Sequence, residues 1–140
     1  MNKPQIAGNK ITIPSSQDFL PDVDMFIEGI LRGYGADESI IADIAISVSE
    51  LVNNAISHGS AEKSDAKVEV EIIKNTDVVS ISVTDEGTGF DPDELDDPLA
   101  QENLLKEVGR GIFIVKSLMD SVDIEPSLNG TKIIMKKSIM

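Results

Sequence analysis

Three polar side chains, Glu50, Asn54 and His58, recur at intervals of four residues within an apolar segment. That interval places them on one face of a helix. A solvated strip of an amphipathic helix is one interpretation. A ligand site is the other, because asparagine disfavours helix interiors and its amide oxygen is a suitable ligand for a hard cation. His58 lies at the expected helix end, where the helix dipole stabilises it, and it is given no catalytic role.

A second candidate lies directly after an expected strand, where Asp85 is followed by Gly87 and Gly89. Aspartate and glycine also cluster in ordinary turns, so a plain turn is the simpler interpretation. A glycine pair, however, permits close backbone approach to a ligand. A carboxylate at the strand end can accept a hydrogen bond from an exocyclic amine, which would select adenine over guanine.

A third candidate is the run Gly109, Arg110 and Gly111, which stands where a helix is expected to begin. The free N–H groups and the positive dipole end of a helix N-terminus favour phosphate at that place. The two glycines would let a ligand come near, and Arg110 would add positive charge. A hinge that leads into the helix explains the same residues equally well.

The last candidate is the segment 129–132, which reads Asn-Gly-Thr-Lys. An Asn-Gly pair between two alternating segments most simply predicts a hairpin turn. Thr131 directly after it could offer a hydroxyl group to a phosphate. Both interpretations stay open on the residues alone.

The elements that would position these residues follow from periodicity, since alternation predicts strands and helical spacing of apolar residues predicts helices. The expected elements are a strand at 5–13, helices at about 15–34 and 37–58, strands at 67–74 and 78–84, an acidic connection at 85–108, a helix from about 109 to 120, and strands at 121–126 and 131–137. This order fits an α+β fold, a two-layer α/β sandwich with a mixed, mostly antiparallel sheet and helices on one face. We expect residues 1–140 to form a single domain.

Composition excludes several classes of function. The formal net charge of −13, from 25 acidic and 12 basic residues, disfavours direct nucleic-acid binding because a phosphate backbone is repelled. The sequence has no cysteine, which excludes disulfides and thiolate chemistry. We expect neither a signal peptide nor a run of membrane-spanning length, so a cytoplasmic location is the default and no membrane partner is expected.

Taken in order, the segments ELVNNAISHG, DEGTGF, GRGIFIVKSLMD and NGTK resemble the nucleotide-binding boxes of the GHKL ATPase superfamily, whose fold is the Bergerat sandwich. Nearly the whole chain is similar to the anti-sigma-factor serine-protein kinases of the RsbW and SpoIIAB type. The resemblance implies ATP and Mg²⁺ as cofactors. It implies nucleotide-binding roles for the four boxes, and their residues here are Asn54, Asp85, Gly87, Gly89, Gly109, Arg110, Gly111 and Thr131.

Within those boxes the resemblance assigns individual roles. Glu50 corresponds to the general base, Asn54 to the magnesium ligand and Asp85 to the aspartate that reads adenine. Gly109 and Gly111 correspond to glycines of a lid that closes on the phosphates. Sensor histidine kinases usually carry an amide where Glu50 stands, so the glutamate favours a hydroxyl acceptor, which benefits from proton removal.

The function that the resemblance implies is ATP-dependent phosphorylation of a serine or threonine on a small STAS-like antagonist protein. The implied partners are this antagonist and a sigma factor, with a homodimer as the implied assembly. The alternative is a nucleotide-binding regulatory module with little or no kinase activity, whose partner is not a sigma factor. Retention of both Glu50 and Asn54 favours the enzyme. ATP hydrolysis without a protein acceptor is less favoured, because no transducing domain is seen.

Overall fold

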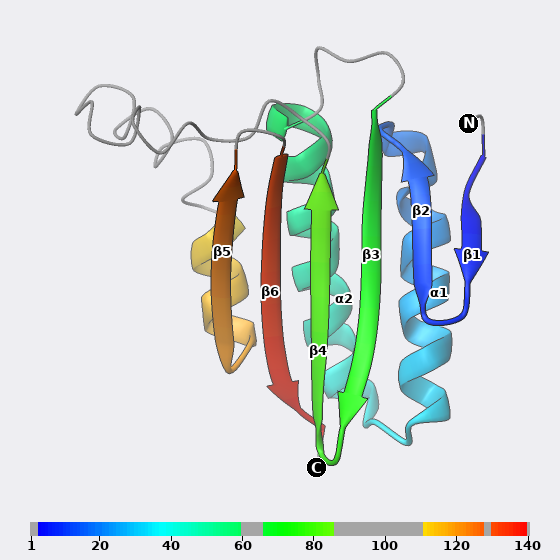
Figure 1. Cartoon of the computed structure of the whole chain (residues 1–140). Helices are drawn as coiled ribbons and strands as arrows, with labels where there is room; N and C mark the ends of the chain where they lie inside the picture. The colour runs from blue at the N-terminus through cyan, green and yellow to red at the C-terminus, as the bar shows by residue number, and fades with distance from the viewer. Residues whose placement is uncertain (1–2, 60–65, 86–110, 128–129, 140) are drawn as a thin grey trace.

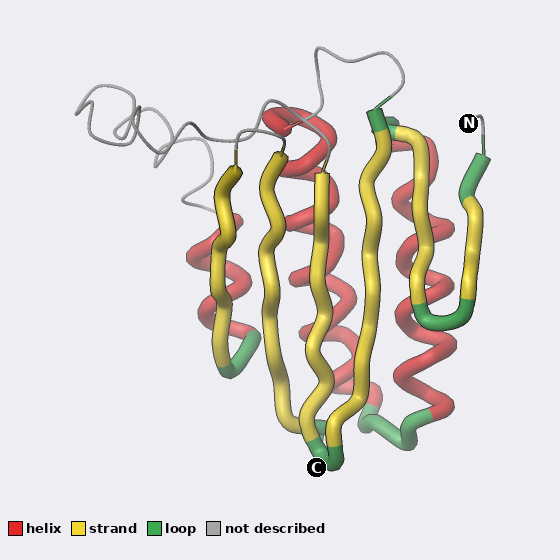
Figure 2. Tube along the Cα trace, viewed as in Figure 1, coloured by secondary structure: helices red, strands yellow, loops and turns green. Residues whose placement is uncertain are grey.

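The computed structural model describes residues 3–59, 66–85, 111–127 and 130–139. Its described strands form one six-stranded sheet in the order β1-β2-β3-β4-β6-β5, and every neighbouring pair is antiparallel (Figure 1). The strands are β1 (Gln5–Ala7), β2 (Lys10–Pro14), β3 (Lys67–Asn75), β4 (Val78–Asp85), β5 (Ser121–Ser127) and β6 (Gly130–Ser138). The helices are a 3₁₀ turn (Gln17–Phe19), α1 (Leu20–Gly33), α2 (Glu38–Asn54), a π-helical turn (Ala55–Gly59) and a helix at 111–118. The described helices lie on one face of the sheet (Figure 2), which confirms the expected α+β sandwich.

Strict alternation in the central strands explains the two layers. In β3 and β4 the residues at every second position are buried against the helices, and their neighbours face outward. The buried row consists of Val68, Val70, Ile72, Val79, Ile81 and Val83. The outward row is polar, with Glu69 and Glu71 on β3 facing Thr84 and Ser82 on β4. The sheet therefore has one apolar face for the helices and one polar face.

The N-terminal segment corrects the sequence prediction, because residues 5–13 do not form a single strand. Ala7 pairs with Lys10, so Gly8 and Asn9 make a two-residue hairpin turn between β1 and β2. Gly8 has a φ of +64°, a conformation that glycine adopts at little cost. The Asn9 side chain and backbone also hydrogen-bond the backbone of Ile72, so the turn extends the contact of β2 with β3.

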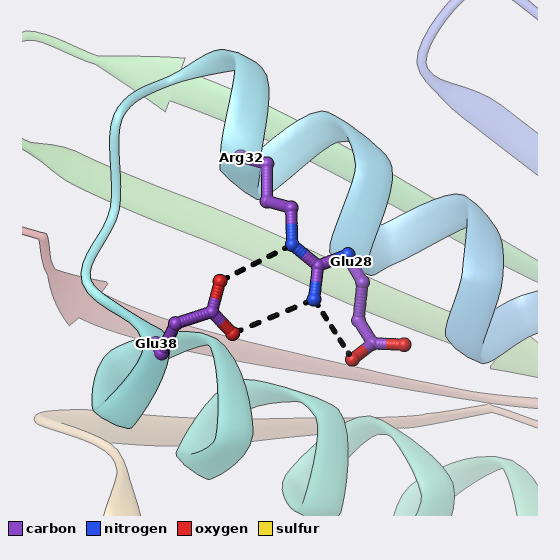
Figure 3. Close-up of polar contacts among 3 residues, drawn as sticks. All are labelled: Glu28, Arg32 and Glu38. Carbon is purple, nitrogen blue, oxygen red and sulfur yellow. Dashed lines mark hydrogen bonds and ion pairs between the residues drawn. The ribbon is translucent and has the colours of Figure 1, made fainter.

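The first helical region agrees with the predicted start. The Ser16 hydroxyl accepts a hydrogen bond from the Asp18 N–H at 3.2 Å, and Pro21 lies in the first turn of α1, where its missing N–H costs nothing. Figure 3 shows how the other end of α1 is joined to α2. Arg32 contacts Glu38 at 3.3 Å and Glu28 at 3.7 Å. The hydrogen bond with Glu38 raises the pKa of Arg32, but the pair is exposed and contributes little to stability.

Helix α2 supplies the centre of the core. The segment Glu38–Ser57 is 20 residues long with a mean hydropathy of 1.3, so it is long and apolar enough to span a membrane by length and composition. The expectation that no run reaches that length is therefore wrong. In this fold its apolar side chains Ile41, Ile44, Val48, Leu51 and Val52 are buried under the sheet. A core helix explains the hydropathy.

Candidate nucleotide site

The polar residues of α2 lie at the end where the helix changes geometry. The α-helical segment stops at Asn54, and Ala55–Gly59 continue as a π-helical turn. The expectation of one α-helix to His58 is therefore wrong, and the four-residue spacing that joined His58 to Glu50 and Asn54 does not continue past Asn54. π-Helical turns widen the helix by one residue per turn and recur at functional sites.

Glu50 and Asn54 meet Gly111, the first described residue of a helix that ends at Leu118. A Cβ atom at Gly111 would lie 2.5 Å from Asn54 Nδ2 and 3.4 Å from Glu50 Oε2. A contact of 2.5 Å is too short for a real Cβ atom, so any larger residue at this position would force the Asn54 amide to move. The structure thus brings together three of the residues that the sequence singled out, from two elements about sixty positions apart in the chain.

The Asn54 side chain has an unusual environment. Its Nδ2 atom is buried and has no hydrogen-bond partner among the residues that the structure describes. Buried polar groups nearly always have a partner, and the exceptions frequently mark a place that a ligand completes. The unpaired group is an N–H donor, whereas a cation would be bound by the oxygen at the other end of the same amide.

Asp85 and Thr131 form the second part of the site. They are directly opposite each other on β4 and β6, and the Thr131 N–H donates to Asp85 Oδ1 at 3.3 Å. Both residues are 8% exposed. Asp85 continues the buried row of β4, so a carboxylate occupies a position where the preceding alternate residues are apolar. A carboxylate is seldom buried without a partner or a task.

Gly130 completes this pair and was interpreted from the sequence only as part of a turn. A Cβ atom at this position would collide with the backbone oxygen of Asp85. Glycine therefore lets the start of β6 approach the end of β4 closely enough for the Thr131 N–H to reach the carboxylate. The Asn-Gly dipeptide was the available signal, but it does not reveal the neighbouring strand.

The two parts belong to the same end of the molecule. In Figure 1 the C-terminal end of α2, the last residues of β4 and the first residues of β6 lie at the top, and the Arg32 contacts lie between the helices at the opposite end. Helix α2 and the π-helical turn pack against β4. The other residues that the sequence singled out, Gly87, Gly89, Gly109 and Arg110, lie outside the described residues.

The amide of Asn54 fits a hard cation. Its oxygen is a ligand that Mg²⁺ accepts, and few protein ligands are needed where phosphates and water complete the shell. Among the described residues there is no group of three or more His, Asp or Glu side chains that could hold a metal alone. The residues therefore suit a metal that arrives with a phosphate ligand better than a metal held only by protein.

Comparison with known proteins decides the family. The profile of the histidine kinase-like ATPase domain matches residues 13–137. The chain belongs to this family. The match runs from β2 to β6 and so includes Glu50, Asn54, Asp85, Gly111 and Thr131.

Members of the histidine kinase-like ATPase family with related sequences include a serine-protein kinase RsbW from Staphylococcus aureus strain bovine RF122 / ET3-1. It is 30% identical over 139 residues, which are 93% of this chain and 86% of the relative. A further Staphylococcus aureus serine-protein kinase RsbW is 29% identical over 143 residues, 93% of this chain and 89% of the relative. The identity is spread along almost the full length of both proteins.

Solved structures of other proteins share the fold. The RsbU and RsbW domains of Rv1364c from Mycobacterium tuberculosis align with a TM-score of 0.69 at 24% identity. The alignment covers 93% of this chain and 32% of that one, so this chain spans about a third of the mycobacterial protein. The histidine kinase domain of the blue-light activated kinase EL346 from Erythrobacter litoralis aligns with a TM-score of 0.57 at 22% identity, over 91% of this chain and 62% of that one.

Proposed function

We propose that this chain is an ATP-dependent serine/threonine protein kinase that serves as an anti-sigma factor and phosphorylates a small antagonist protein. The observation that carries the proposal is the meeting of Glu50, Asn54 and Gly111. A carboxylate that can accept a proton, an amide, and a glycine that permits close approach of a ligand suit phosphoryl transfer when they lie at one place. The similarity to serine-protein kinases supports a protein hydroxyl as the acceptor.

In this proposal the two parts of the site hold the two ends of ATP. Asp85, kept in place by the Thr131 N–H, accepts a hydrogen bond from the exocyclic amine of adenine. The Thr131 backbone N–H thus acts at the base end, and a contact of its hydroxyl with a phosphate stays a prediction. Gly111 is proposed to lie beside the phosphates, and Gly87, Gly89, Gly109 and Arg110 are proposed to line the same nucleotide.

Glu50 and Asn54 act at the phosphate end. Asn54 would hold Mg²⁺, which neutralises charge on the phosphates when it is bound. Glu50 accepts the proton of the attacking hydroxyl while the hydroxyl oxygen bonds to the γ-phosphorus. The bond from that phosphorus to the bridging oxygen breaks, and ADP leaves. The products are a phosphorylated antagonist and ADP, with one proton on Glu50 that passes to solvent.

The Asp85→Asn variant tests the adenine site. An amide presents a donor as well as an acceptor to the base, so we expect ATP to bind about 10- to 100-fold more weakly, the effect of ~1–3 kcal/mol from one mispaired buried group. The preference for ATP over GTP should disappear as well. Calorimetric titration with ATP, ADP and GTP, with and without Mg²⁺, measures both effects.

Asp123→Asn is the matched control for the adenine site, since Asp123 is exposed on β5 and has no place in the proposal. It should bind ATP as the wild type does. Equal affinity of Asp85→Asn and wild type for ATP would refute the assignment of Asp85. Absence of ATP binding by the wild type would refute the proposed function itself.

The Gly111→Ala variant tests the contact at the phosphate end. Its new methyl group would lie where the Asn54 amide is, and that side chain must turn away. Because the end of an asparagine side chain can move, we expect stability to change by less than ~1 kcal/mol while ATP binds about tenfold more weakly. Thermal unfolding and calorimetry separate the two quantities.

Gly29→Ala is the control for this glycine, because a Cβ atom there meets nothing within 4 Å. It lies in α1, where alanine is the better helix former, so it should keep wild-type ATP affinity and stability or gain slightly in stability. Unchanged ATP affinity in Gly111→Ala would mean that the Asn54 contact has no part in binding.

Incubation with labelled ATP and a purified antagonist protein tests the transfer step. Label on a serine or threonine of the antagonist supports the kinase. Tight complex formation without label would instead indicate a nucleotide-dependent binding module. From the similarity to serine-protein kinases RsbW we also propose a sigma-factor partner, a homodimer and a cytoplasmic location.

A further inference from the structure

Lys137 is a charged residue in the apolar layer of the fold. It lies on β6 opposite Val79, in the row that also contains Met135 and Ile139, and it faces the helices. Its side chain is only 15% exposed. A lysine is rarely placed so deep unless its ammonium group has a specific partner.

Its partners come from two different helices. The Nζ atom donates a hydrogen bond to the backbone oxygen of Leu118, the last residue of the helix at 111–118. The same atom lies 3.8 Å from Asp43 Oδ2 on α2. A cation at the last carbonyl of a helix satisfies an otherwise free acceptor and interacts favourably with the dipole.

Two further hydrogen bonds hold Asp120, two residues beyond Leu118, at the same place. The Asp120 N–H donates to the Lys136 oxygen at 2.9 Å, and Asp120 Oδ2 accepts from the Ser138 N–H at 2.7 Å. The C-terminal end of the helix at 111–118 is therefore tied to one short stretch of β6. About two turns before Leu118, the same helix contains Gly111, which lies against Asn54 and Glu50.

Apolar packing alone would not fix this helix along its axis. Val115 and Met119 are buried and hold the helix against the core, but hydrophobic contacts are non-directional and tolerate small slips. A hydrogen bond to the terminal carbonyl is directional. Since an α-helix rises ~1.5 Å per residue and moves as a rod, a slip at Leu118 moves Gly111 by the same distance.

We propose that Lys137 is a positioning residue of the nucleotide site. It sets the axial position of the helix at 111–118 and thereby the contact of Gly111 with Asn54. Its effect on ATP binding rests on the proposed function, whereas its effect on the Asn54 contact does not.

The first test uses the full chain without nucleotide. The side-chain amide signals of Asn54, assigned by their absence from Asn54→Ala, report the contact with Gly111 by NMR. We expect these signals to shift in Lys137→Met and to stay near the wild-type positions in Lys137→Arg, which keeps a charged donor. Lys136→Met is the matched control, since Lys136 is the exposed neighbour on the other face of β6, and it should shift nothing.

The second test measures ATP affinity by calorimetry. Lys137→Met should bind ATP about fivefold to tenfold more weakly, because the contact of Gly111 with Asn54 at the proposed phosphate end is displaced. Combined with Gly111→Ala, which already disturbs the contact, Lys137→Met should cost much less than it does alone. Full additivity of the two substitutions would contradict coupling through this helix.

Each outcome decides the proposal. If Lys137→Met lowers the melting temperature but leaves the Asn54 signals and the ATP affinity unchanged, Lys137 is a purely structural residue. That result would overturn the proposal. Should Lys137→Met not fold, Lys137→Gln takes its place with the same expectations. The glutamine side chain is too short to bring its amide to the Leu118 oxygen. A wild type that binds no ATP would end the proposed function and leave the NMR test standing.

Discussion

Replacing Asn54 with alanine is expected to abolish the contribution of Mg²⁺ to ATP binding. Among the described residues, the Asn54 Nδ2 is a buried atom without a hydrogen-bond partner, and it lies beside Gly111. A hydrogen bond or ligand contact to a charged group contributes at most ~3 kcal/mol. Losing that much binding free energy makes ATP bind about a hundredfold more weakly. Calorimetric titrations of the variant with ATP, in Mg²⁺ and in EDTA, should give nearly equal affinities.

The neighbouring asparagine provides the matched control. Asn53 accepts a hydrogen bond from Gln17 at 2.8 Å in an exposed contact away from Gly111. Asn53→Ala therefore makes the same chemical change one position away and should retain Mg²⁺-dependent binding. If both variants lose it, the effect reflects the end of α2 as a whole; if neither does, Asn54 is not the ligand.

The second large effect is expected for Glu50→Gln. This change keeps the size of the side chain and removes its ability to accept a proton, so phosphoryl transfer to the antagonist should fall by ~10²–10⁴-fold. ATP affinity should change by no more than about twofold, because the proposed role begins only when the hydroxyl attacks. Single-turnover transfer of labelled phosphate and calorimetry measure the two quantities separately.

Glu38→Gln controls for removal of one negative charge from α2. Glu38 lies at the first residue of that helix, where it contacts Arg32 at 3.3 Å, far from Asn54 along the helix. It should leave both transfer and binding unchanged. Normal phosphoryl transfer by Glu50→Gln would exclude the general-base role. An equal loss of ATP binding and of transfer would indicate that Glu50 contacts ATP before the reaction begins.

Much of the fold was predictable because local and tertiary preferences agree. The alternation of β3 and β4 and the apolar face of α2 predicted those elements to within a few residues. The β1–β2 hairpin was missed because period-two alternation continues on both sides of Gly8 and hides the turn. The π-helical turn was missed because nothing in the residues Ala55–Gly59 distinguishes it from an α-helix.

The site was only partly predictable for a different reason. Residue types and order singled out Glu50, Asn54, Asp85, Gly111 and Thr131. Their pairing was not predictable, since the contact of Gly111 with Asn54 depends on how two helices pack. The same limit applies to Lys137, whose place on the buried face follows only from the register of β6 with β4.

The pairing of Asp85 with Thr131 also bears on the order in which the protein assembles. Strands β3 and β4, and likewise β5 and β6, are neighbours in sequence and can close as separate hairpins. The pairing of β4 with β6 brings together residues that are 46 positions apart, such as Asp85 and Thr131. Forming it therefore costs more chain entropy than forming either hairpin. We infer that this pairing forms late in folding. A nucleotide bound across it would act as a cross-link between two hairpins and would selectively raise the resistance of the C-terminal part to unfolding.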